Sequence, residues 1–334
     1  MHRDSSQPLV SICIPTYNGE RWLAECIDSA LRQTYTPLEI LVVDDCSTDS
    51  TAALVSSVPD GRIRLIVNQA NRGLVGNWNE CVRQAHGEYI KFLFQDDTLH
   101  PQCVEKMMRV FAEHPQLGMV FARREFVVAD DAPAELTREL LEHYSDLHRK
   151  FDGVQSVNHG RRLFAQHLEK EFALSCVAEP PSTLIRKEVF QSLGLFNTKM
   201  HQACDVEMWL RIMFYYDLGF VDEELLIFRI HGKSASASNR SANRAEYDRF
   251  WMLEGLLSHS EIQREYPQIE SWRNKFFSHN KNSLVRPKAG WRSIITKQGF
   301  AQAVADARRL PRRIKFLREA QAFQKSHAPL HPRL

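Results

Sequence analysis

Residues 8–125 alternate short apolar runs with longer segments in which apolar residues recur at helical spacing. Leu9–Ile14, which ends at Pro15, and Leu38–Val43 are typical of buried strands. Between them, Glu20–Gln33 places its apolar side chains on one helical face. Strands separated by helices of about 10–15 residues indicate βαβ units and a parallel sheet. The alternation therefore predicts an α/β, Rossmann-like fold with a mostly parallel central sheet flanked by helices.

The same patterns continue along the chain. Further strands are predicted at Arg62–Val67, Glu88–Phe94, Leu117–Phe121 and Glu224–Ile230, and helices at Ser50–Ser57, Val75–Ala85, Pro101–Glu113, Lys187–Leu193 and Cys204–Tyr216. Residues 129–170 are polar and less periodic. They are compatible with helix, with a mobile flap or with an insertion on the acceptor side.

The composition is that of an ordinary globular protein, with 334 residues of which 43% are hydrophobic. Such a chain can bury the core of one large domain, or of one domain with an extension. Its seven cysteines are scattered and never spaced as CxxC, which argues against a disulfide framework or a zinc knuckle. Met1–Pro8 lacks the apolar stretch of a secretory signal, and no run of about 18 apolar residues follows. We therefore expect a cytoplasmic protein.

The character of the chain changes after about Ser234. Residues 234–243 are rich in Ser, Asn and Ala and are predicted to be a linker, whereas Ala245–Phe277 has helical character. Residues 286–325 hold eleven Lys or Arg against two acids. A basic amphipathic helix there would bind the inner face of an anionic membrane, whereas a solvated helical face explains the same composition. No aromatic–basic motif supports nucleic-acid binding.

Polar residues follow three of the predicted strands. Thr16-Tyr17 comes after the first strand, Asp44-Asp45 after the second, and Gln95-Asp96-Asp97 after the fourth. Parallel α/β sheets bind ligands in the crevice beyond the carboxyl ends of their strands, so these side chains are expected to meet there.

Asp96 and Asp97 are candidate ligands for Mg²⁺ or Mn²⁺, because both ions prefer hard oxygen ligands. The alternative is that Asp97 caps the following helix and that Asp96 is a solvated loop acid. His231 ends a strand and could complete a metal site or contact a phosphate, although a single histidine is more often structural.

Asp205 opens a predicted helix and is a candidate general base, a role typically worth about 10²- to 10⁴-fold in rate. The plain alternative is that it caps that helix. Glu207 is the competing base. On the nucleoside side, Asp45 can accept a hydrogen bond from a base N–H, and Arg72 can meet a phosphate.

Taken together, these segments resemble family-2 inverting glycosyltransferases of the GT-A fold over residues 8–238. The resemblance lies in Ser11-Ile-Cys-Ile-Pro-Thr-Tyr-Asn-Gly19, Ile40-Leu-Val-Val-Asp-Asp-Cys-Ser-Thr-Asp49, Asn71-Arg-Gly73, Ala85-His-Gly-Glu-Tyr-Ile90, Gln95-Asp-Asp97, Pro181-Ser-Thr-Leu-Ile-Arg-Lys187, Leu193-Gly-Leu-Phe196, Asp205-Val-Glu-Met-Trp-Leu-Arg211 and Phe228-Arg-Ile-His231.

The resemblance implies a nucleotide-sugar donor, usually a UDP-sugar, and Mn²⁺ or Mg²⁺ as cofactor. The implied nucleotide-sugar site comprises Pro15, Thr16, Tyr17, Asp45, Asn71, Arg72, Gly73, Gln95 and Asp96. The implied metal ligands are Asp96, Asp97 and His231, and Asp205 matches the catalytic base. Two positions depart from the family pattern. Phe94 stands where the first acid of the Asp-x-Asp motif is usual, and Cys204 stands where a Glu often precedes the base.

We therefore expect a GT-A domain at residues 1–238, with a nucleotide-sugar half at about 8–125 and an acceptor half at about 126–238. Residues 239–334 would form a helical, basic extension. The expected activity is inverting sugar transfer to a saccharide or lipid-linked saccharide in bacterial surface polysaccharide or glycolipid assembly. The alternative is a non-catalytic pseudo-glycosyltransferase that binds or acts as a scaffold, which Phe94 would favour. A nicotinamide oxidoreductase should show GxGxxG after the first strand, and Thr16-Tyr-Asn-Gly19 stands there instead.

Overall fold

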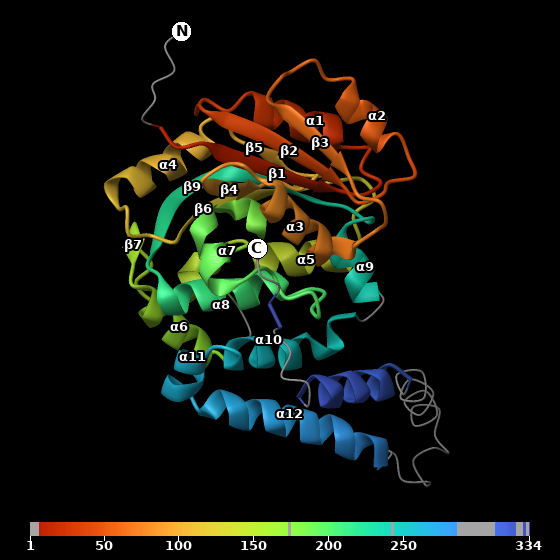
Figure 1. The fold of residues 1–334 in the computed structure, drawn as a ribbon, viewed down its shortest axis with the longest axis vertical. Coiled ribbons are helices and arrows are strands. Elements are labelled where there is room, and N and C mark those ends of the chain that lie inside the picture. The colour runs from red at the N-terminus through yellow and green to blue at the C-terminus, as the bar shows by residue number, and fades with distance from the viewer. Residues whose placement is uncertain (1–6, 173–174, 242–243, 286–310, 325–329, 332–333) are drawn as a thin grey trace. The chain divides into compact units, whose positions relative to one another are not determined.

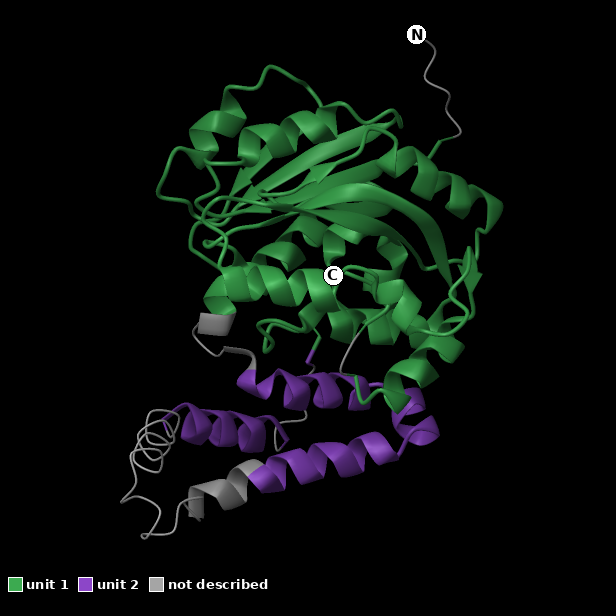
Figure 2. Ribbon diagram, turned by 180° about the vertical axis from the view of Figure 1, so that it is seen from behind, with its two compact units in different colours: residues 1–245, 331–334 green, residues 246–330 purple. Residues whose placement is uncertain are grey.

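The computed structural model describes residues 7–172, 175–241, 244–285, 311–324, 330–331 and 334. The chain divides into two compact units, one formed by residues 1–245 with 331–334 and the other by residues 246–330 (Figure 2). The predicted domain limits near residues 125 and 238 stay predictions.

Within the described residues, nine strands of the first unit form one sheet (Figure 1). Four parallel strands stand in the order β3, β2, β1, β4, and their bounds are Ile63–Val67, Leu38–Asp44, Val10–Thr16 and Tyr89–Phe92. The sheet continues through β8 (Thr183–Arg186), which is antiparallel to both β4 and β6 (Met119–Val128). Next comes β9 (Leu218–Ile230), parallel to β6 and antiparallel to the two-residue strands β5 (Thr98–Leu99) and β7 (Val157–Asn158). The predicted mostly parallel α/β sheet is confirmed for its first four strands, and the other half is mixed.

Helices flank the sheet because side chains of each strand alternate between its two faces. The helices α1 (Leu23–Leu31), α2 (Thr51–Ser56) and α4 (Cys103–Glu113) pack on the face that carries Ile12 and Ile40. The opposite face carries Cys13, whose Sγ contacts the carbonyl oxygen of Cys81 in α3 (Gly73–Gln84). Two further helices of this unit, α7 and α8, span Lys187–Leu193 and Cys204–Tyr215.

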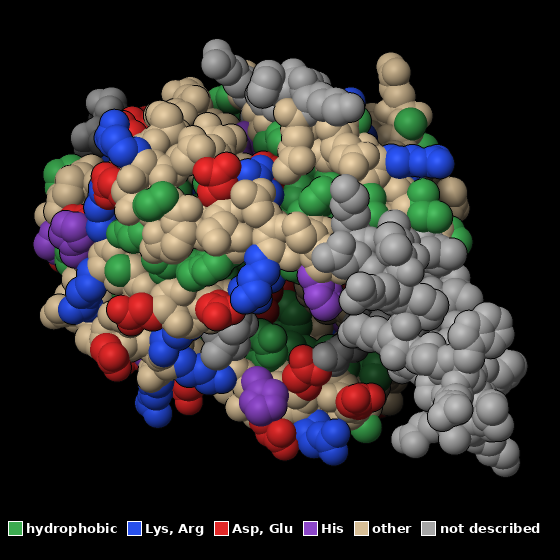
Figure 3. Space-filling model, turned by 90° about the horizontal axis from the view of Figure 1, so that it is seen from below, with side chains coloured by type: hydrophobic (Ala, Val, Ile, Leu, Met, Phe, Trp, Pro, Cys, Tyr) green, Lys and Arg blue, Asp and Glu red, His purple; other side chains and the backbone are tan. Residues whose placement is uncertain are grey.

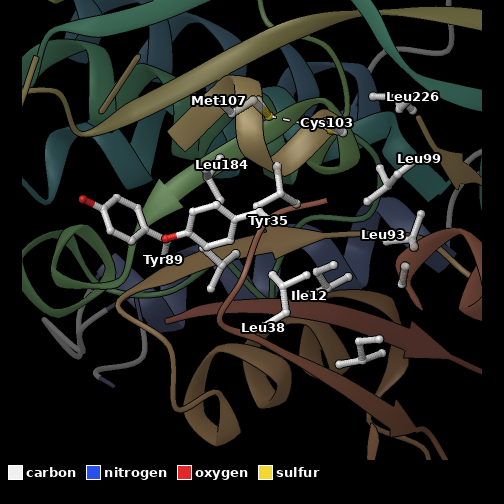
Figure 4. Close-up of a cluster of buried hydrophobic side chains, with 14 of the residues drawn as sticks. Ile12, Tyr35, Leu38, Tyr89, Leu93, Leu99, Cys103, Met107, Leu184 and Leu226 are labelled. Atoms are coloured by element: carbon white, nitrogen blue, oxygen red, sulfur yellow. Dashed lines mark hydrogen bonds between the residues drawn. The ribbon is translucent and has the colours of Figure 1, made fainter. Parts of the chain in front are cut away.

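The core between the first face and its helices is continuous and apolar. Figure 4 shows Ile12 and Leu38 of the parallel strands beside Tyr35, Leu93 and Leu184. Met107 and Cys103 of α4 close this cluster from the helical side. This packing fixes the carboxyl ends of β1, β2 and β4 at one edge of the sheet, which is where the polar residues follow.

Two local predictions differ from the structure. The expected linker at residues 234–243 contains a helix, α9 (Ala235–Ser241), whose Ser236 accepts a hydrogen bond from Gln202 and whose Asn239 donates one to the carbonyl oxygen of His201. Pro101 lies before α4, which begins at Cys103, instead of occupying the first position of the helix. Residues 129–170 contain α5 (Ala134–His143), the short 3₁₀ turn Leu147–Lys150, β7 and α6 (Gly160–Glu169).

The second unit consists of helices around an aromatic core. Its elements are α10 (Asp248–Leu257), α11 (Ser260–Glu265), α12 (Gln268–Val285) and a helical stretch at 311–324. The ring of Phe316 stacks on Tyr247 with centroids 4.1 Å apart, and it meets Phe250 edge-on at 5.1 Å.

The basic tail falls only partly within this description, because residues 286–310 and 325 lie outside the described residues. In the part that is described, Phe316, Leu317 and Ala320 are buried, whereas Arg312, Lys315 and Arg318 are exposed. The apolar side of residues 311–324 is therefore used in packing.

Among the described residues, no helix combines the length and the apolar character that crossing a membrane requires. On the face drawn in Figure 3, acidic and basic side chains are interspersed over the described surface.

Candidate active site

A cavity of about 780 Å³ opens in the first unit. We call the residues numbered 15–96 its N-terminal side and those numbered 179–239 its C-terminal side. The N-terminal side comprises Pro15, Thr16, Tyr17, Asp45, Asn71, Arg72, Gly73, Leu74, Val75, Gly76, Asn77, Trp78, Phe94, Gln95 and Asp96. The C-terminal side comprises Glu179, Pro180, Thr198, Met200, His201, Gln202, Asp205, Phe228, Lys233, Ser234, Ala235, Ser236, Ser238 and Asn239.

Asp45 follows β2 and anchors the loop that precedes α3. Its Oδ1 accepts hydrogen bonds from the Arg72 N–H at 2.8 Å and from Nδ2 of Asn68 at 2.9 Å. Its Oδ2 accepts one from the Gly73 N–H at 2.9 Å. Gly73 has φ of +74°, a left-handed conformation that glycine adopts without steric cost. A carboxylate offers about four lone-pair positions, so Asp45 keeps capacity for a further donor.

Gln95 joins the ends of β4 and β1. Its Oε1 accepts hydrogen bonds from Oγ1 of Thr16 at 2.6 Å and from the Tyr17 N–H at 2.8 Å. A Cβ atom at Gly19 would lie 2.4 Å from this Oε1, so a larger residue there would have to displace the Gln95 amide. Gln95 thus fixes the Thr16–Tyr17 segment of the cavity rim.

Asp96 and His231 meet although 135 residues separate them. Nε2 of His231 lies 2.8 Å from Oδ2 of Asp96, and His231 is 5% exposed. Nδ1 of His231 is buried without a hydrogen-bond partner among the described residues. Within that part of the chain, no group of three or more His, Cys, Asp or Glu is arranged to hold a metal by itself.

Asp97 has a different environment from Asp96. It is 1% exposed, it is not among the residues that line the cavity, and its Oδ1 accepts a hydrogen bond from the Arg229 N–H at 2.9 Å. Burial raises the pKa of the Asp97 carboxyl well above its usual value, and the neighbouring charge of Asp96 raises it further. Asp97 therefore favours the neutral acid and ties the end of β4 to β9.

Phe94 belongs to an aromatic cluster at the floor of the cavity. Its ring stacks on Trp78 with centroids 5.1 Å apart, and Trp78 meets Phe196 edge-on at 5.4 Å. Both Phe94 and Trp78 line the cavity. Where the resemblance predicts an acid, this chain therefore has the apolar ring of Phe94, which packs on Trp78.

Asp205 lies in the first turn of α8 and lines the cavity from the C-terminal side. Glu207, the competing candidate, is fully buried and forms an ion pair with Arg211 at 2.9 Å. His331 completes this pair, with Nε2 at 2.8 Å from Oε1 of Glu207. Burial raises the pKa of Glu207, but the Arg211 and His331 contacts outweigh it and hold the pKa at about 2. Glu207 is therefore a structural ion, and Asp205 is the acid of α8 that reaches the cavity.

The structure thus brings all nine predicted nucleotide-sugar residues and Asp205 to one cavity, whereas Asp97 and His231 are not among the residues that line it. The sequence analysis missed Glu179, the segment Thr198–Gln202 and Asn239. A signal for Glu179 was present, because it is an isolated acid between Val177-Ala178 and Pro180-Pro181. The residues of α9 gave no such signal.

This chain belongs to glycosyl transferase family 2 and has the GT-A fold. The family model described as "Glycosyl transferase family 2" matches residues 11–126. Among its relatives is an uncharacterized protein of Mycobacterium tuberculosis (strain CDC 1551 / Oshkosh), which is 32% identical over 252 residues, or 75% of this chain and 76% of the relative.

Two solved structures share the fold. One is S. aureus TarS 1–349 in complex with UDP-GlcNAc, with a TM-score of 0.58 and 16% identity over 89% of this chain and 79% of that one. The other is the Pyrobaculum calidifontis mannosyltransferase PcManGT in complex with GDP-Man and Mn²⁺, with a TM-score of 0.55 and 16% identity over 94% and 84% of the two chains. At these identities the likeness concerns the fold alone.

Proposed function

We propose that this family-2 glycosyltransferase transfers a sugar from a nucleoside diphosphate sugar to an acceptor hydroxyl with inversion at the sugar carbon. One observation carries the proposal: Asp45, Asp96 and Asp205, which come from three separate segments, line the same cavity of about 780 Å³. A cavity of this size suits a ligand as large as a nucleotide sugar.

The N-terminal side would hold the nucleotide. Asp45 would accept a hydrogen bond from a base N–H, next to Pro15, Thr16 and Tyr17, and Arg72 would face the phosphates. Uridine is our first choice of base, and the UDP-GlcNAc bound to TarS supports it. The GDP-Man bound to PcManGT makes guanosine the competing base in any test.

Mn²⁺ or Mg²⁺ fits the residues present. The paired Asp96 and His231 offer one carboxylate and one imidazole, and Nδ1 of His231 is buried without a partner among the described residues. Two protein ligands suffice where substrate phosphates supply the others, which is usual for such ions. When bound, the ion would neutralise the charge of the departing diphosphate. We assign Asp97 to the support of this site through Arg229, with direct ligation as the alternative.

Asp205 would act as the general base. It would take the proton from the acceptor oxygen as that oxygen attacks the sugar carbon from the face opposite the diphosphate. The C–O bond to the acceptor forms while the bond to the diphosphate breaks, so a single displacement inverts the centre. No second carboxylate nucleophile is needed, in contrast to a retaining glycosidase.

The acceptor in our proposal is a saccharide or a lipid-linked saccharide, in polysaccharide or glycolipid assembly, as the family resemblance suggests. Peripheral membrane contact through residues 286–325 is part of this proposal. In the described portion, exposed Arg312, Lys315 and Arg318 support attraction to anionic lipid. A test is co-sedimentation with liposomes that contain anionic lipid, with and without residues 286–334, and equal pelleting would remove the membrane contact.

The competing function is a non-catalytic, pseudo-glycosyltransferase subunit, and the Phe94–Trp78 stack in place of an acid favours it. One experiment separates the two. In a thermal-shift assay with UDP, GDP and the corresponding nucleotide sugars, with and without Mn²⁺, one nucleotide should raise the unfolding midpoint in the presence of metal. Slow release of diphosphate from the matching sugar would then establish catalysis. Binding without any turnover would support the non-catalytic subunit. The absence of nucleotide binding would refute the transferase and leave only a scaffold role.

A further inference from the structure

Four acidic side chains line the cavity, and the proposed function uses three of them. Asp45 serves the nucleotide, Asp96 the metal and Asp205 the acceptor. Glu179 is the fourth, and a quarter of its side chain remains exposed.

The segment around Glu179 is held from two separate elements. Nε1 of Trp209, one turn after the candidate base in α8, donates a hydrogen bond to the carbonyl oxygen of Ala178 at 3.0 Å. Nζ of Lys91, a fully buried side chain of β4, donates to the carbonyl oxygen of Pro181. The backbone on both sides of Glu179 is thus fixed, as a recognition residue requires.

Arg124 orients the Glu179 carboxylate. It follows a register shift of β6 against β9 at residues Arg123 and Arg124, and such bulges turn a side chain out of the regular pleat. Its Nε lies 2.8 Å from Oε2 of Glu179, and its Nη2 donates to Oε1 at 3.2 Å. The guanidinium lies over Phe126 at 4.7 Å, and the Arg124 side chain is 2% exposed.

The Arg124–Glu179 pair lies near the end of β4 that carries Asp96. The Arg124 guanidinium is 5.9 Å from the ring centroid of Phe228, which itself lines the cavity. The next residue, Arg229, donates its backbone N–H to Asp97 and its Nε to the carbonyl oxygen of Asp96 at 3.1 Å. Glu179 therefore belongs to the donor end of the cavity, next to the candidate diphosphate site.

We propose that Glu179, positioned by Arg124, accepts a hydrogen bond from a hydroxyl group of the transferred sugar and so selects a neutral sugar. The inference rests on the proposed function. Arg124 neutralises the carboxylate, so the pair requires no cationic ligand. The Arg124 guanidinium occupies one lone pair of the Glu179 Oε1 atom and leaves the other for a hydroxyl donor. This role makes Glu179 a specificity residue for the donor.

The test compares nucleotide sugars with the bare nucleotides, so that the contribution of the sugar is measured alone. Calorimetric Kd values would be obtained with Mn²⁺ for UDP, UDP-glucose, UDP-galactose, UDP-GlcNAc, GDP and GDP-mannose. For the sugar that binds better than its nucleotide, Glu179→Gln should weaken the Kd about 10- to 100-fold, which is the range for one hydrogen bond to a charged group. The Kd of the bare nucleotide should change less than about twofold.

Because Glu179→Gln leaves a buried guanidinium without its ion partner, the double variant Arg124→Met with Glu179→Gln is measured as well. It should show the same selective loss. Glu188→Gln, an exposed acid outside the cavity, is the matched control and should change neither Kd.

Two results would overturn the inference while leaving the proposed function intact. One is an unchanged affinity for the nucleotide sugar in both Glu179 variants. The other is wild-type protein that binds UDP or GDP but gains nothing from any sugar in the panel. If wild-type protein binds no nucleotide at all, the proposed function fails first, and the inference fails with it.

Discussion

The two sides of the cavity are built in different ways. The N-terminal side comes from the carboxyl ends of β1, β2 and β4, and from the loop after β3 together with the first turns of α3. The C-terminal side comes from the turn before the antiparallel strand β8, from the loop before α8 and its first turn, and from the end of β9 with the following loop and α9. Neighbouring parallel strands bring the first set together, and Asp45 and Gln95 tie its loops to one another. The second set comes from segments outside these four strands.

This difference separates two functions in our proposal. The N-terminal side holds the nucleotide on a sheet edge fixed by the core, and the C-terminal side carries the base and the contact to the sugar. Side-chain contacts hold the second set, such as Trp209 with Ala178 and Asn239 with His201. Substitutions on the two sides should therefore affect different steps of the reaction.

The largest effect is expected from Asp205→Asn on the C-terminal side. It removes the proton acceptor, so release of diphosphate from the nucleotide sugar should slow about 10²-fold or more, as is typical for loss of a general base. The Kd of the nucleoside diphosphate should stay within about twofold. Asp222→Asn, an exposed acid of β9, is the control. Near-normal turnover would show that Asp205 is not the general base. It would also contradict the assignment of binding to the N-terminal side and of catalysis to the C-terminal side.

A fall in pH should destabilise the packing of α6 against α8, because it protonates His167 of α6. This residue lies in α6, which packs on α8, and its ring contacts Phe151 with centroids 4.2 Å apart. Burial lowers the pKa of His167 from 6.5 to about 4. Because the folded pKa is the lower one, its contribution to stability is complete above about pH 6.5 and is lost as the pH falls toward 4.

The loss amounts to about 3 kcal/mol in the free energy of unfolding, since each unit of pKa corresponds to about 1.4 kcal/mol. In urea unfolding experiments between pH 7 and 4, the free energy of unfolding should therefore fall by about 3 kcal/mol more for wild type than for His167→Gln. His143→Gln, at an exposed position of α5, should follow the wild type. Equal declines for wild type and His167→Gln would contradict the prediction.

On the N-terminal side, Asp45→Asn should weaken binding of the nucleoside diphosphate about tenfold. An amide cannot accept from Asn68, Arg72 and Gly73 together as the carboxylate does, so the loop before α3 loses its anchor. Calorimetry gives the Kd, and Asp60→Asn, outside the cavity, is the control. A fall in turnover at unchanged affinity would show that the two sides do not divide binding from reaction.

The smallest effect is expected from Asn239→Ala in α9. Its Nδ2 donates to the carbonyl oxygen of His201 at 2.7 Å and lies 3.2 Å from Oε1 of Gln202. Loss of about 1 kcal/mol of hydrogen bonding should lower kcat/KM for the nucleotide sugar about fivefold. Gln191→Ala in α7 should leave it unchanged. If Asn239→Ala also has no effect, α9 does not shape the C-terminal side.

Much of the fold could be predicted because the relevant signals are local. The parallel strands and α8 follow from apolar runs and helical periodicity, and their bounds agree with the prediction to within a few residues. The helix α9 could not be found in this way. Its Ser, Ala and Asn residues lack an apolar stripe, and Asn239 and Ser236 hold it by contacts with residues 201 and 202.

The candidate site divides along the same line. Asp45 and Asp96 were predicted because acids at the ends of parallel strands converge by geometry. Glu179 was missed because it lies in the turn before β8. This strand is antiparallel and inserted between β4 and β6, so the rule for parallel strands does not place Glu179. The sequence could not distinguish Asp205 from Glu207, since only the three-dimensional packing reveals that Arg211 and His331 bind the Glu207 carboxylate.

The contact between His331 and Glu207 bears on how shortened versions of this chain should be designed. A deletion that starts before His331 withdraws a partner from a buried ion two residues from Asp205. Loss of activity after such a deletion would then have two possible causes: a disturbed α8, which carries Asp205, or the loss of the helical extension itself. Trimming experiments on the second unit therefore need the His331→Ala substitution in the intact chain beside them.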